Sequence, residues 1–523
     1  MESSASPKIP EIQPSMRADA ASHRRLLGWC LLVGLAIRIW LSLTSFCVSG
    51  DGPAYIGMAR SFADGDWRTP LGAVFSPLYP LLMAGMHRLI PDWEINGNLL
   101  SAILGTGAIG SIYLLTKEVF ADSKIALGAA ALTAIHPDLA ALSASVRTEA
   151  GYIFFTTLAV WLILRATREG SLPLAAGAGA VVGLAYLYRT EAVGLILLNA
   201  IFPALSALLW RRDRFVRSIA LGLVSLIAAS ALVAPYVFFL HAATGHWTIG
   251  RELDVVILLG LGAASPNKSH FESFAFSAHV SPLTELMSHP RLYLSKVRED
   301  LVDSFYNLLQ AEGPLVAILL AIGLWKRGRR LFRNPAEAFL LFLVLSYFGG
   351  FALTRTGTRF LIHLIPYTFG WVIIGLAALT EYIQTLGDSL SWLVPELLPA
   401  AVLALILLPQ ALWPIGYDMR GARYAGEEIA RRNAHAGSVI ARDGRVAWYA
   451  NAHFLALPTS KVTSFCDWLA AQNNPGYVLI GEHDERQFGI TPRTSCLGFI
   501  KRYPRYGSGY YDLYAVEHHG AAS

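Results

Sequence analysis

The sequence predicts a polytopic α-helical membrane protein with roughly 11 transmembrane helices, followed by a soluble α/β domain. Of its 523 residues, 54% are hydrophobic and only 15% are charged, whereas a soluble protein carries about 25% charged residues. The apolar residues form runs close to the ~20 residues that span a bilayer. Near residue 415 the composition changes to that of a soluble domain.

The N-terminal segment is polar and is expected to be a disordered cytoplasmic leader over residues 1–24. Arg24 and Arg25 precede the first apolar run, residues 26–47. This layout resembles a signal peptide, but the run is long and has no obvious small-residue cleavage site. We interpret it as a retained signal anchor with the N-terminus inside.

The membrane domain is expected over residues 25–414, with a first outer loop at 48–95 and a long outer loop at 241–303. Within these loops, residues 78–90 and 255–264 are apolar but too short to span and are expected to lie along the membrane. The ten spans after the first are expected at 96–116, 124–136, 151–164, 172–188, 192–210, 219–240, 314–325, 336–353, 360–379 and 392–413.

Charge supports this topology. The net charge is only +5, and the basic residues lie between spans, which concerns orientation and gives no sign of nucleic-acid binding. The dense basic loops after Trp210 and Trp325 both fall inside, as the positive-inside rule requires. An odd span count places the C-terminal domain outside. If the pair of spans around residues 379–392 is miscounted, that domain changes sides.

The C-terminal domain, residues 415–523, is long enough for a small α/β domain with its own core. Its sequence predicts a helix at 425–433 and strands at 438–441, 446–449 and 477–480. It contains no nucleotide-binding fingerprint. Four cysteines are too few for a disulfide scaffold or metal cluster, but Cys466 and Cys496 could pair in an oxidising compartment.

Asp51 directly follows the first apolar run, in the segment Ser49-Gly50-Asp51-Gly52-Pro53. A carboxylate at this position can stay ionised at the mouth of a cavity between the spans, which suits a general base. The alternative is an aspartate that caps a helix beginning near Pro53. The sequence leaves both interpretations open.

Several other ionisable residues are also predicted at or beyond the outer ends of spans. With Asp51 they are Asp138, Arg147, Glu149, Arg189, Glu191, Arg355 and Arg359. Because they come from separate hairpins, a bundle could gather several of them around one outward-facing cavity. Arginine binds phosphate bidentately, and a carboxylate can activate a nucleophile or hold a metal, so this set suits a phosphate-bearing ligand. Simple interfacial ion pairs are the alternative.

A divalent metal is a further possibility. Asp51, Asp138, Glu149 and His136 supply ligands that suit Mg²⁺ or Mn²⁺ better than zinc. Their spacing is not diagnostic, and His136 before Pro137 is expected to be a helix-end histidine. The sequence therefore leaves open whether a divalent metal binds.

The order of short motifs resembles that of a known family. The motifs are Asp51-Gly-Pro-Ala-Tyr-Ile-Gly-Met-Ala-Arg60, Ser76-Pro-Leu-Tyr-Pro80, His136-Pro137, Arg147-Thr-Glu149, Tyr188-Arg-Thr-Glu191, and Thr354-Arg-Thr-Gly-Thr-Arg-Phe360 with Pro366. Over residues 25–520 the chain resembles the GT-C superfamily of integral-membrane glycosyltransferases. It is most similar to the bacterial protein-mannosyltransferase-like and aminoarabinose-transferase-like branch.

This resemblance implies transfer of a sugar from a polyprenyl-phosphate donor to a lipid, glycan or protein acceptor. The reaction would take place at the outer face of the bacterial inner membrane, with the C-terminal domain in the periplasm. It implies that Asp51 is the general base, and that Arg189, Arg355 and Arg359 bind the phosphate leaving group. Four further residues would orient the sugar or a metal: Tyr55, Asp138, Glu149 and Glu191.

One departure from the family concerns the metal. Members often carry two adjacent acidic residues after the first span, whereas Gly52 follows Asp51 here. A paired-carboxylate metal site built from that motif is therefore not expected. Metal independence, or a metal held by another loop, remains open.

Two other function classes are compatible with an outer-face charge cluster. A transporter or flippase of lipid-linked sugars should have charges near mid-span and often has repeated halves. The sequence has few such charges and no clear internal repeat, and its acids gather on one side of the membrane. A scaffold whose C-terminal domain binds a partner would leave the loop arginines unexplained. The pattern favours one-sided chemistry.

Overall fold

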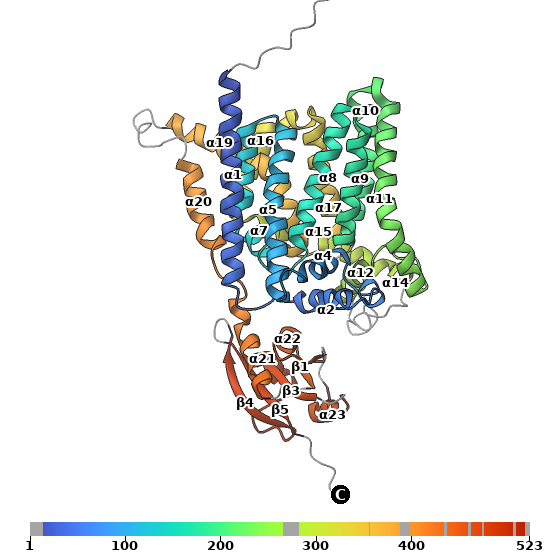
Figure 1. Ribbon diagram of the computed structural model, residues 1–523, viewed down its shortest axis with the longest axis vertical. Coiled ribbons are helices and arrows are strands. Elements are labelled where there is room, and N and C mark those ends of the chain that lie inside the picture. Colours follow the sequence, from blue (N-terminus) through green and yellow to red (C-terminus); the bar gives the residue numbers. More distant parts are fainter. Residues whose placement is uncertain are drawn as a thin grey trace, which may run out of the picture.

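The computed structural model describes residues 14–264, 282–354, 356–386, 398–432, 437–458, 462–472, 475–505 and 509–517. A bundle of long helices and a small α/β domain lie one after the other along the long axis of the molecule (Figure 1). Helix α1 (Pro14–Leu43) begins at the end of the bundle away from the α/β domain (Figure 1). Residues 14–24, expected to belong to a disordered leader, are therefore part of α1.

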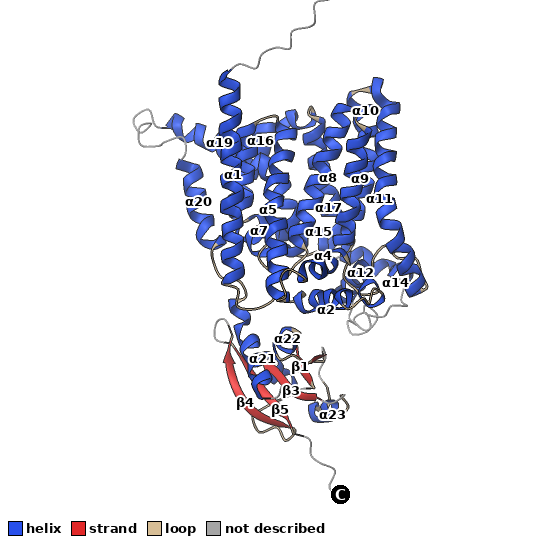
Figure 2. Ribbon diagram, in the orientation of Figure 1, coloured by secondary structure: helices blue, strands red, loops and turns tan. Residues whose placement is uncertain are grey.

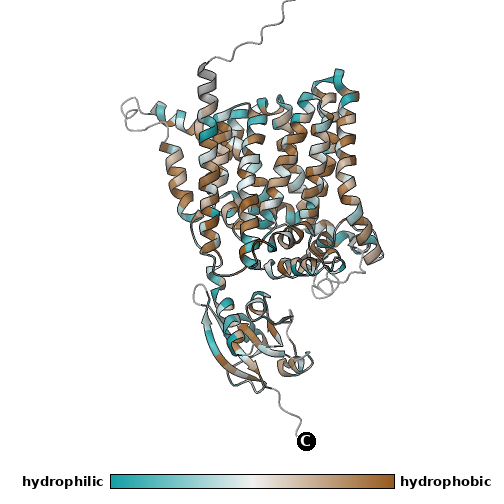
Figure 3. Cartoon of the chain, viewed as in Figure 1, coloured by the Kyte–Doolittle hydropathy of each residue, from teal (hydrophilic) through white to brown (hydrophobic). Residues whose placement is uncertain are grey.

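Seven helices within the described residues are long and apolar enough to cross a membrane, and one sharply bent pair would make an eighth. The seven spans are formed by α1, α5 (Trp93–Phe120), α8 (Glu149–Glu169), α10 (Val193–Trp210), α11 (Phe215–Thr244), α17 (Pro335–Leu353) and α19 (Ile365–Leu386). Hydrophobic residues cover the middle of the bundle, and hydrophilic residues gather at its ends (Figure 3). The protein is thus a multi-pass membrane protein.

The other expected spans have different forms. Helices α15 (Pro290–Glu312) and α16 (Pro314–Arg327) are the bent pair, with an angle of 105° between its two parts. Three further apolar helices are shorter: α6 (Ser123–Ile135), α9 (Leu172–Tyr188) and α20 (Leu398–Ala411). The predicted number of roughly 11 spans therefore stays a prediction. Part of the last predicted span, before residue 398, lies outside the described residues.

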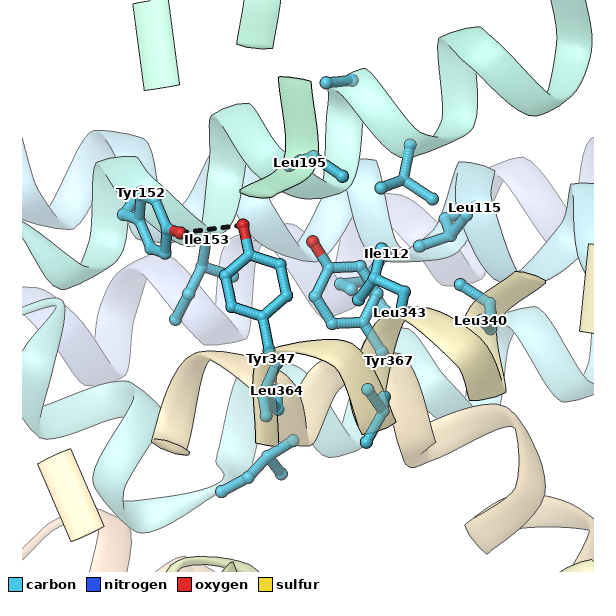
Figure 4. Packing of buried hydrophobic residues seen from close by; sticks show 14 of the residues in the cluster. Ile112, Leu115, Tyr152, Ile153, Leu195, Leu340, Leu343, Tyr347, Leu364 and Tyr367 are labelled. Atoms are coloured by element: carbon cyan, nitrogen blue, oxygen red, sulfur yellow. Dashed lines mark hydrogen bonds between the residues drawn. The ribbon is translucent and has the colours of Figure 1, made fainter. Parts of the chain in front are cut away.

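Helix packing depends on close backbone approach and on satisfied buried hydroxyls. A Cβ atom on Gly323 of α16 or on Gly375 of α19 would lie 1.9 Å from a backbone oxygen of the other helix, so only glycine fits there. In the core, the hydroxyls of Tyr152 and Tyr347 form a hydrogen bond of 3.2 Å (Figure 4). This bond joins α8, three residues after its first residue Glu149, to the C-terminal half of α17.

Short helices form a layer across the end of the bundle that faces the α/β domain (Figures 1 and 2). They include α2 (Gly52–Ala63), α3 (Arg68–Leu71), α4 (Leu78–His87), α12 (Arg251–Ala264) and α14 (Pro282–Ser288). The two apolar segments expected to lie along the membrane fall on α4 and α12. The predicted long outer loop, 241–303, thus contains α12, α14 and the start of α15.

A separate hydrophobic cluster fixes α2 and α4 to the bundle. It comprises Val48, Tyr55, Ile56, Ala59, Tyr79, Met83, Leu100, Val146 and Tyr188. The Tyr79 hydroxyl is buried and donates to the carbonyl of Gly97 at 3.0 Å. The first outer loop is therefore packed onto the membrane helices, which restricts where Asp51 can lie.

The remaining short elements of the bundle lie between its longer helices. They are α7 (Pro137–Leu142), α18 (Thr358–Leu361) and the 3₁₀ turns Thr190–Ala192, Arg212–Arg214, Gly328–Phe332 and Ile362–Leu364. The basic loops at Arg212–Arg214 and Gly328–Phe332 follow α10 and α16, at the end of the bundle opposite to Asp51 (Figure 1).

The α/β domain contains one five-stranded sheet with strand order β2-β1-β3-β5-β4. Its strands are β1 (Ser438–Ala441), β2 (His453–Ala456), β3 (Pro475–Gly481), β4 (Leu497–Pro504) and β5 (Tyr510–Val516). β1 pairs in parallel with β2 and β3, and β5 pairs antiparallel with β3 and β4. Its helices are α21 (Arg420–Arg432), α22 (Arg445–Tyr449), α23 (Phe465–Ala470) and α24 (Glu482–Phe488), with a 3₁₀ turn at Tyr417–Met419. The structure contains the Cys466–Cys496 disulfide.

The predicted strand at 446–449 is wrong, because these residues form α22. The Asp443 carboxylate accepts a hydrogen bond from the Arg445 N–H at 2.9 Å and supports the first turn of the helix. Val446 and Ala447 are buried in the domain core, while Tyr449 faces the bundle. A segment of five residues is too short for its hydrophobic periodicity to distinguish a strand from a helix.

Candidate active site

Asp51 occupies the N-cap position of α2, but its side chain does not cap the helix. Its Oδ2 atom instead accepts a hydrogen bond from Nη1 of Arg359 at 2.5 Å. The two residues are 308 positions apart in the chain. The capping interpretation therefore does not describe this carboxylate, which points towards a distant arginine.

Arg359, in α18, joins two acidic groups. Besides Asp51 it contacts the Oε1 atom of Glu149 through its Nε atom. Glu149 is the first residue of α8 and is only 2% exposed, whereas the Arg359 side chain is 37% exposed. A buried carboxylate thus holds an arginine that a ligand can still reach.

Arg189, which directly follows α9, is surrounded by acceptors. Its guanidinium contacts Glu191 at 2.7 Å and Glu149 at 3.4 Å, and donates to the Thr148 hydroxyl at 3.3 Å. Glu252, on α12, lies 3.9 Å away. Since the Arg189 side chain is 7% exposed and already shared among these groups, it orders the carboxylates of the site.

Part of the hydrogen-bonding capacity of this cluster is unused within the described residues. The Oε2 atoms of Glu149 and Glu191 are buried and have no partner there. The Arg147 guanidinium forms no hydrogen bond or ion pair with any described side chain. It lines a cavity of about 280 Å³ together with Arg359, Asp138 and other residues of α7 and α18. This cavity offers two guanidinium groups to a ligand.

A second cavity, of about 330 Å³, also adjoins the cluster through Glu191. Its lining is mainly apolar and includes Val193, Leu197, Leu198, Leu253, Tyr347 and Phe351. Tyr347 is the residue that bonds to Tyr152 in Figure 4, and its hydroxyl lies 3.4 Å from the Glu191 carbonyl. The first cavity, here called the polar cavity after its charged residues Asp138, Arg147 and Arg359, reaches the cluster at Arg359, and the apolar cavity reaches it at Glu191.

The structure brings together five of the residues proposed from the sequence: Asp51, Glu149, Arg189, Glu191 and Arg359. The others lie differently. Tyr55 is buried beneath the cluster, with its hydroxyl 3.4 Å from that of Thr148, and burial raises its pKa well above the ordinary value. Asp138 is exposed in the first turn of α7 and lines the polar cavity. Arg355 lies outside the described residues.

Sequence reasoning missed Glu252 and Thr148. Burial and the neighbouring Glu191 raise the pKa of Glu252 to about 8, so it carries a proton at neutral pH. The available signal was the Arg251-Glu252 pair at the start of a short apolar segment. Thr148 lies inside the Arg147-Thr-Glu149 motif, of which only the two charged residues were proposed for the site.

The side chains proposed for a metal do not fit one. Within the described residues, no group of three or more His, Cys, Asp or Glu side chains could hold a metal ion. Arginines separate the carboxylates of the cluster, and Asp51 and Glu149 both contact Arg359. His136 is buried between α6 and α7, with its ring 5.8 Å from that of Phe369. The geometry resembles an arginine–carboxylate network.

Part of this charged region falls within a stretch that matches a known family. Residues 74–239, which include Arg147, Glu149, Arg189 and Glu191, match the family described as dolichyl-phosphate-mannose-protein mannosyltransferase. Curated protein sequences give no match. The similarity of this chain to known proteins is therefore to this family and to solved structures.

Solved structures match most of the chain. The Archaeoglobus fulgidus oligosaccharyltransferase AglB, in complex with an inhibitory peptide and a dolichol-phosphate, matches with a TM-score of 0.61 and 15% identity over 94% of this chain and 74% of that one. The chain has the GT-C fold. The fold expected from the motif resemblance is thereby confirmed.

Two further structures have the same fold. ArnT from Cupriavidus metallidurans, bound to undecaprenyl phosphate, matches with a TM-score of 0.50 and 14% identity, covering 93% of this chain and 98% of that one. The Archaeoglobus oligosaccharyltransferase in complex with Zn and sulfate matches with a TM-score of 0.52 and 16% identity, over 87% and 67%. At these identities the likeness concerns the fold, and the metal belongs to that protein.

Proposed function

We propose that the protein is a glycosyltransferase that moves a sugar from a polyprenyl-phosphate donor to an acceptor, with Asp51 as general base. The observation that carries this proposal is the bridge that Arg359 forms between Asp51 and the buried Glu149. It joins a candidate base to a partly exposed arginine that lines a cavity and could bind a phosphate. The matched family and the GT-C neighbours support the reaction class.

The donor phosphate would bind Arg359 and Arg147, the two arginines of the polar cavity. Arginine suits this role because it can donate two parallel hydrogen bonds to a phosphate. Arg355, four residues before Arg359, is a further candidate. Arg189, which the sequence also suggested as a phosphate ligand, acts instead by holding Glu149 and Glu191 in place.

The lipid chain of the donor would lie in the apolar cavity. Its lining offers aliphatic and aromatic side chains from α10, α12 and α17, and the cavity reaches the charged cluster at Glu191. A polyprenyl phosphate has the matching chemistry, since a long apolar chain ends in a charged head group. AglB and ArnT, which have the same fold, were each solved with a lipid of this class.

Donor binding would also release the base. In the structure, Arg359 is engaged by Asp51. A phosphate that takes over this guanidinium leaves the Asp51 carboxylate free to accept the proton of the acceptor hydroxyl. The acceptor oxygen then attacks the anomeric carbon, the bond from that carbon to the phosphate oxygen breaks, and the electron pair leaves with the phosphate. Direct displacement inverts the anomeric centre.

The remaining site residues would orient the reactants. Glu149 and Glu191 hold the arginines, Asp138 faces the polar cavity, where a sugar hydroxyl could bind, and Tyr55 supports Thr148 from below. The acceptor would be a lipid, a glycan or a protein. Because the basic loops lie at the opposite end of the bundle, we propose that the N-terminus is inside and the α/β domain is periplasmic.

We further propose that transfer needs no divalent metal, because arginines already neutralise the carboxylates that would otherwise bind one. Positive charge near the leaving phosphate would come from Arg147 and Arg359. A transferase organised in this way should keep its rate when chelator removes Mg²⁺ and Mn²⁺.

The test is transfer of radiolabelled sugar from a panel of polyprenyl-phosphate sugars by the purified protein in detergent, with and without EDTA. We expect transfer from at least one donor, unchanged by EDTA. Binding of donors without transfer to any acceptor of the three classes would overturn the proposal and favour transport of the lipid-linked sugar. Transfer that EDTA abolishes and Mn²⁺ restores would contradict the metal-free mechanism.

A further inference from the structure

The α/β domain contacts the loop that carries Asp51, through the last residue of α22. The Tyr449 hydroxyl accepts a hydrogen bond from the Val48 N–H at 2.7 Å. The same hydroxyl donates to Glu94, at the start of α5, at a distance of 3.2 Å. One side chain of the soluble domain therefore joins two segments of the membrane domain.

Other groups hold the same loop from the C-terminal side. The Phe46 N–H donates to the Ile415 carbonyl at 2.9 Å, and Arg423 of α21 donates to the Phe46 carbonyl at 3.4 Å. On α2, the Arg60 guanidinium lies 4.8 Å from the ring centre of Trp448. Residues 46–48 thus lie between the bundle and the α/β domain.

The held segment leads directly to the charged cluster. Next to Val48, the Ser49 hydroxyl donates to the Val146 carbonyl at 2.5 Å, and the Gly52 N–H donates to the Ser49 carbonyl at 3.0 Å. Asp51 follows three residues after Val48, and Arg147 follows Val146. A shift of Val48 would therefore reach both the candidate base and a candidate phosphate ligand.

Tyr449 has no part in the two hydrophobic clusters of the α/β domain. Trp448 and Tyr449 instead pack against the cluster that fixes α2 and α4 to the bundle. Loss of the Tyr449 hydroxyl would leave the sheet and its core intact. Its structural contribution therefore lies at the junction.

We propose that Tyr449 is a positioning residue: the α/β domain uses its hydroxyl to hold the first outer loop so that Asp51 meets Arg359. This inference rests on the proposed transferase reaction and extends it, since the soluble domain becomes a part of the active-site scaffold. A small displacement of a reacting group lowers the rate even when substrates still bind.

The decisive variant is Tyr449→Phe, which removes the hydroxyl and keeps the ring. We expect kcat to fall about tenfold, with the KM for the lipid donor unchanged. Tyr514→Phe is the matched control, because Tyr514 is buried in the α/β domain and its hydroxyl bonds within that domain, to Glu485 at 2.9 Å. The control should keep the wild-type kcat.

Glu94 provides a second test from the other side of the bond. Glu94→Gln keeps an oxygen that can accept from Tyr449 and should retain nearly full activity. Glu94→Leu removes the acceptor and should reproduce the loss of kcat seen for Tyr449→Phe. Equal effects of both Glu94 variants would contradict the proposed hydrogen bond.

Cys47 reports the loop position without any activity. Its side chain is 2% exposed, and in a Cys30→Ser background it is the single free thiol, since Cys466 and Cys496 are paired. Maleimide labelling should be faster in both Tyr449→Phe and Glu94→Leu than in wild type or Tyr514→Phe; Glu94→Leu keeps the Tyr449 hydroxyl, which bonds to the Cys47 thiol, so its labelling reports the loop position. Unchanged labelling together with an unchanged kcat would overturn the inference, as would equal losses in Tyr514→Phe.

The two proposals fail in distinguishable ways. If wild type transfers sugar but Tyr449→Phe is as fast, the positioning role is wrong and the transferase stands. If wild type transfers nothing, the reaction is wrong, and the rate of Cys47 labelling still decides whether Tyr449 holds the loop.

Discussion

Two buried glutamates at opposite ends of the bundle make different use of neighbouring arginines. Near the start of α17, Glu337 is 0% exposed and both of its oxygens are bonded: Arg327 contacts each, Asn334 donates at 3.2 Å, and Trp371 donates at 3.3 Å. At the end facing the α/β domain, Glu149 bonds through one oxygen only.

The difference separates a structural ion pair from a candidate site. Both carboxylate oxygens of Glu337 have partners, so this side chain has no oxygen left for a ligand. Around Glu149, one carboxylate oxygen has no partner within the described residues, Arg359 remains partly exposed, and two cavities adjoin. Buried groups normally have their hydrogen bonds satisfied, so unused capacity in a cluster beside cavities points to a ligand.

Within this comparison, the largest effect on activity is expected for Glu149. Glu149→Gln removes the charge that holds Arg359 and Arg189, and kcat/KM should fall about 100-fold, the loss expected when charge stabilisation at a transition state is removed. Steady-state transfer by the purified, folded variant measures this effect.

Glu337→Gln is the matched control. It leaves Arg327 without its counter-charge and should lower the free energy of unfolding by about 3 kcal/mol. Thermal unfolding in detergent should report this loss, while the activity per folded molecule stays within about twofold, as expected for a residue outside the site. If Glu337→Gln instead abolishes transfer without unfolding the protein, the comparison between the two ends is wrong.

An intermediate effect is expected for Arg147, which lines the polar cavity and forms no ion pair with a described side chain. Arg147→Ala should raise the KM for the polyprenyl-phosphate donor by about tenfold, the cost of one charge-assisted hydrogen bond. The KM for the acceptor should stay unchanged. Arg168→Ala is the control, since that arginine is 54% exposed and pairs with Glu118 elsewhere in the bundle. A rise in the acceptor KM alone would assign Arg147 to the acceptor.

The smallest effect concerns the pH dependence set by Glu252. Its neighbours are Glu191, Arg189, Asp51 and Arg359. Above its pKa of about 8, Glu252 ionises and adds a negative charge near Arg189, which should weaken phosphate binding. The donor KM should rise a few-fold, roughly, between pH 7 and pH 9 in wild type and stay flat in Glu252→Gln. The same pH rise in both proteins would exclude Glu252 as its source.

The raised pKa of Glu252 has a further consequence for stability. The folded protein keeps a proton on Glu252 that the unfolded chain loses at its ordinary pKa, about 4.3. Stability should therefore fall as pH rises from that value to about 8 and then level off. The melting temperature of Glu252→Gln should decline less over this window.

Much of the site could be predicted because membrane topology sorts residues by side. Asp51, Glu149, Arg189 and Arg359 each follow or precede an apolar run, so a correct orientation of the spans brings them to one end of the bundle. Which acid contacts which arginine could not be predicted, because those distances depend on helix packing. The contact of Glu252 with Arg189 could not be predicted for the same reason.

The number of spans and the type of the short elements were harder to predict than the end of the bundle at which each charged residue lies. Helices α6, α9 and α20 have 13, 17 and 14 residues, so an apolar run alone does not decide whether each crosses the membrane. The α22 segment was read as a strand because its Val, Trp and Tyr favour strands, while Asp443 and the domain core select a helix.

The central claim is that Asp51 is the base of a transfer reaction, and a single-turnover measurement tests it most directly. Asp51→Asn keeps the shape of the side chain, and Asp64→Asn, at the exposed C-terminal end of the same helix, is the control. With saturating donor, transfer by Asp51→Asn should be at least about 100-fold slower, the loss expected for a general base, with donor binding retained. Wild-type rates in Asp51→Asn would contradict the account.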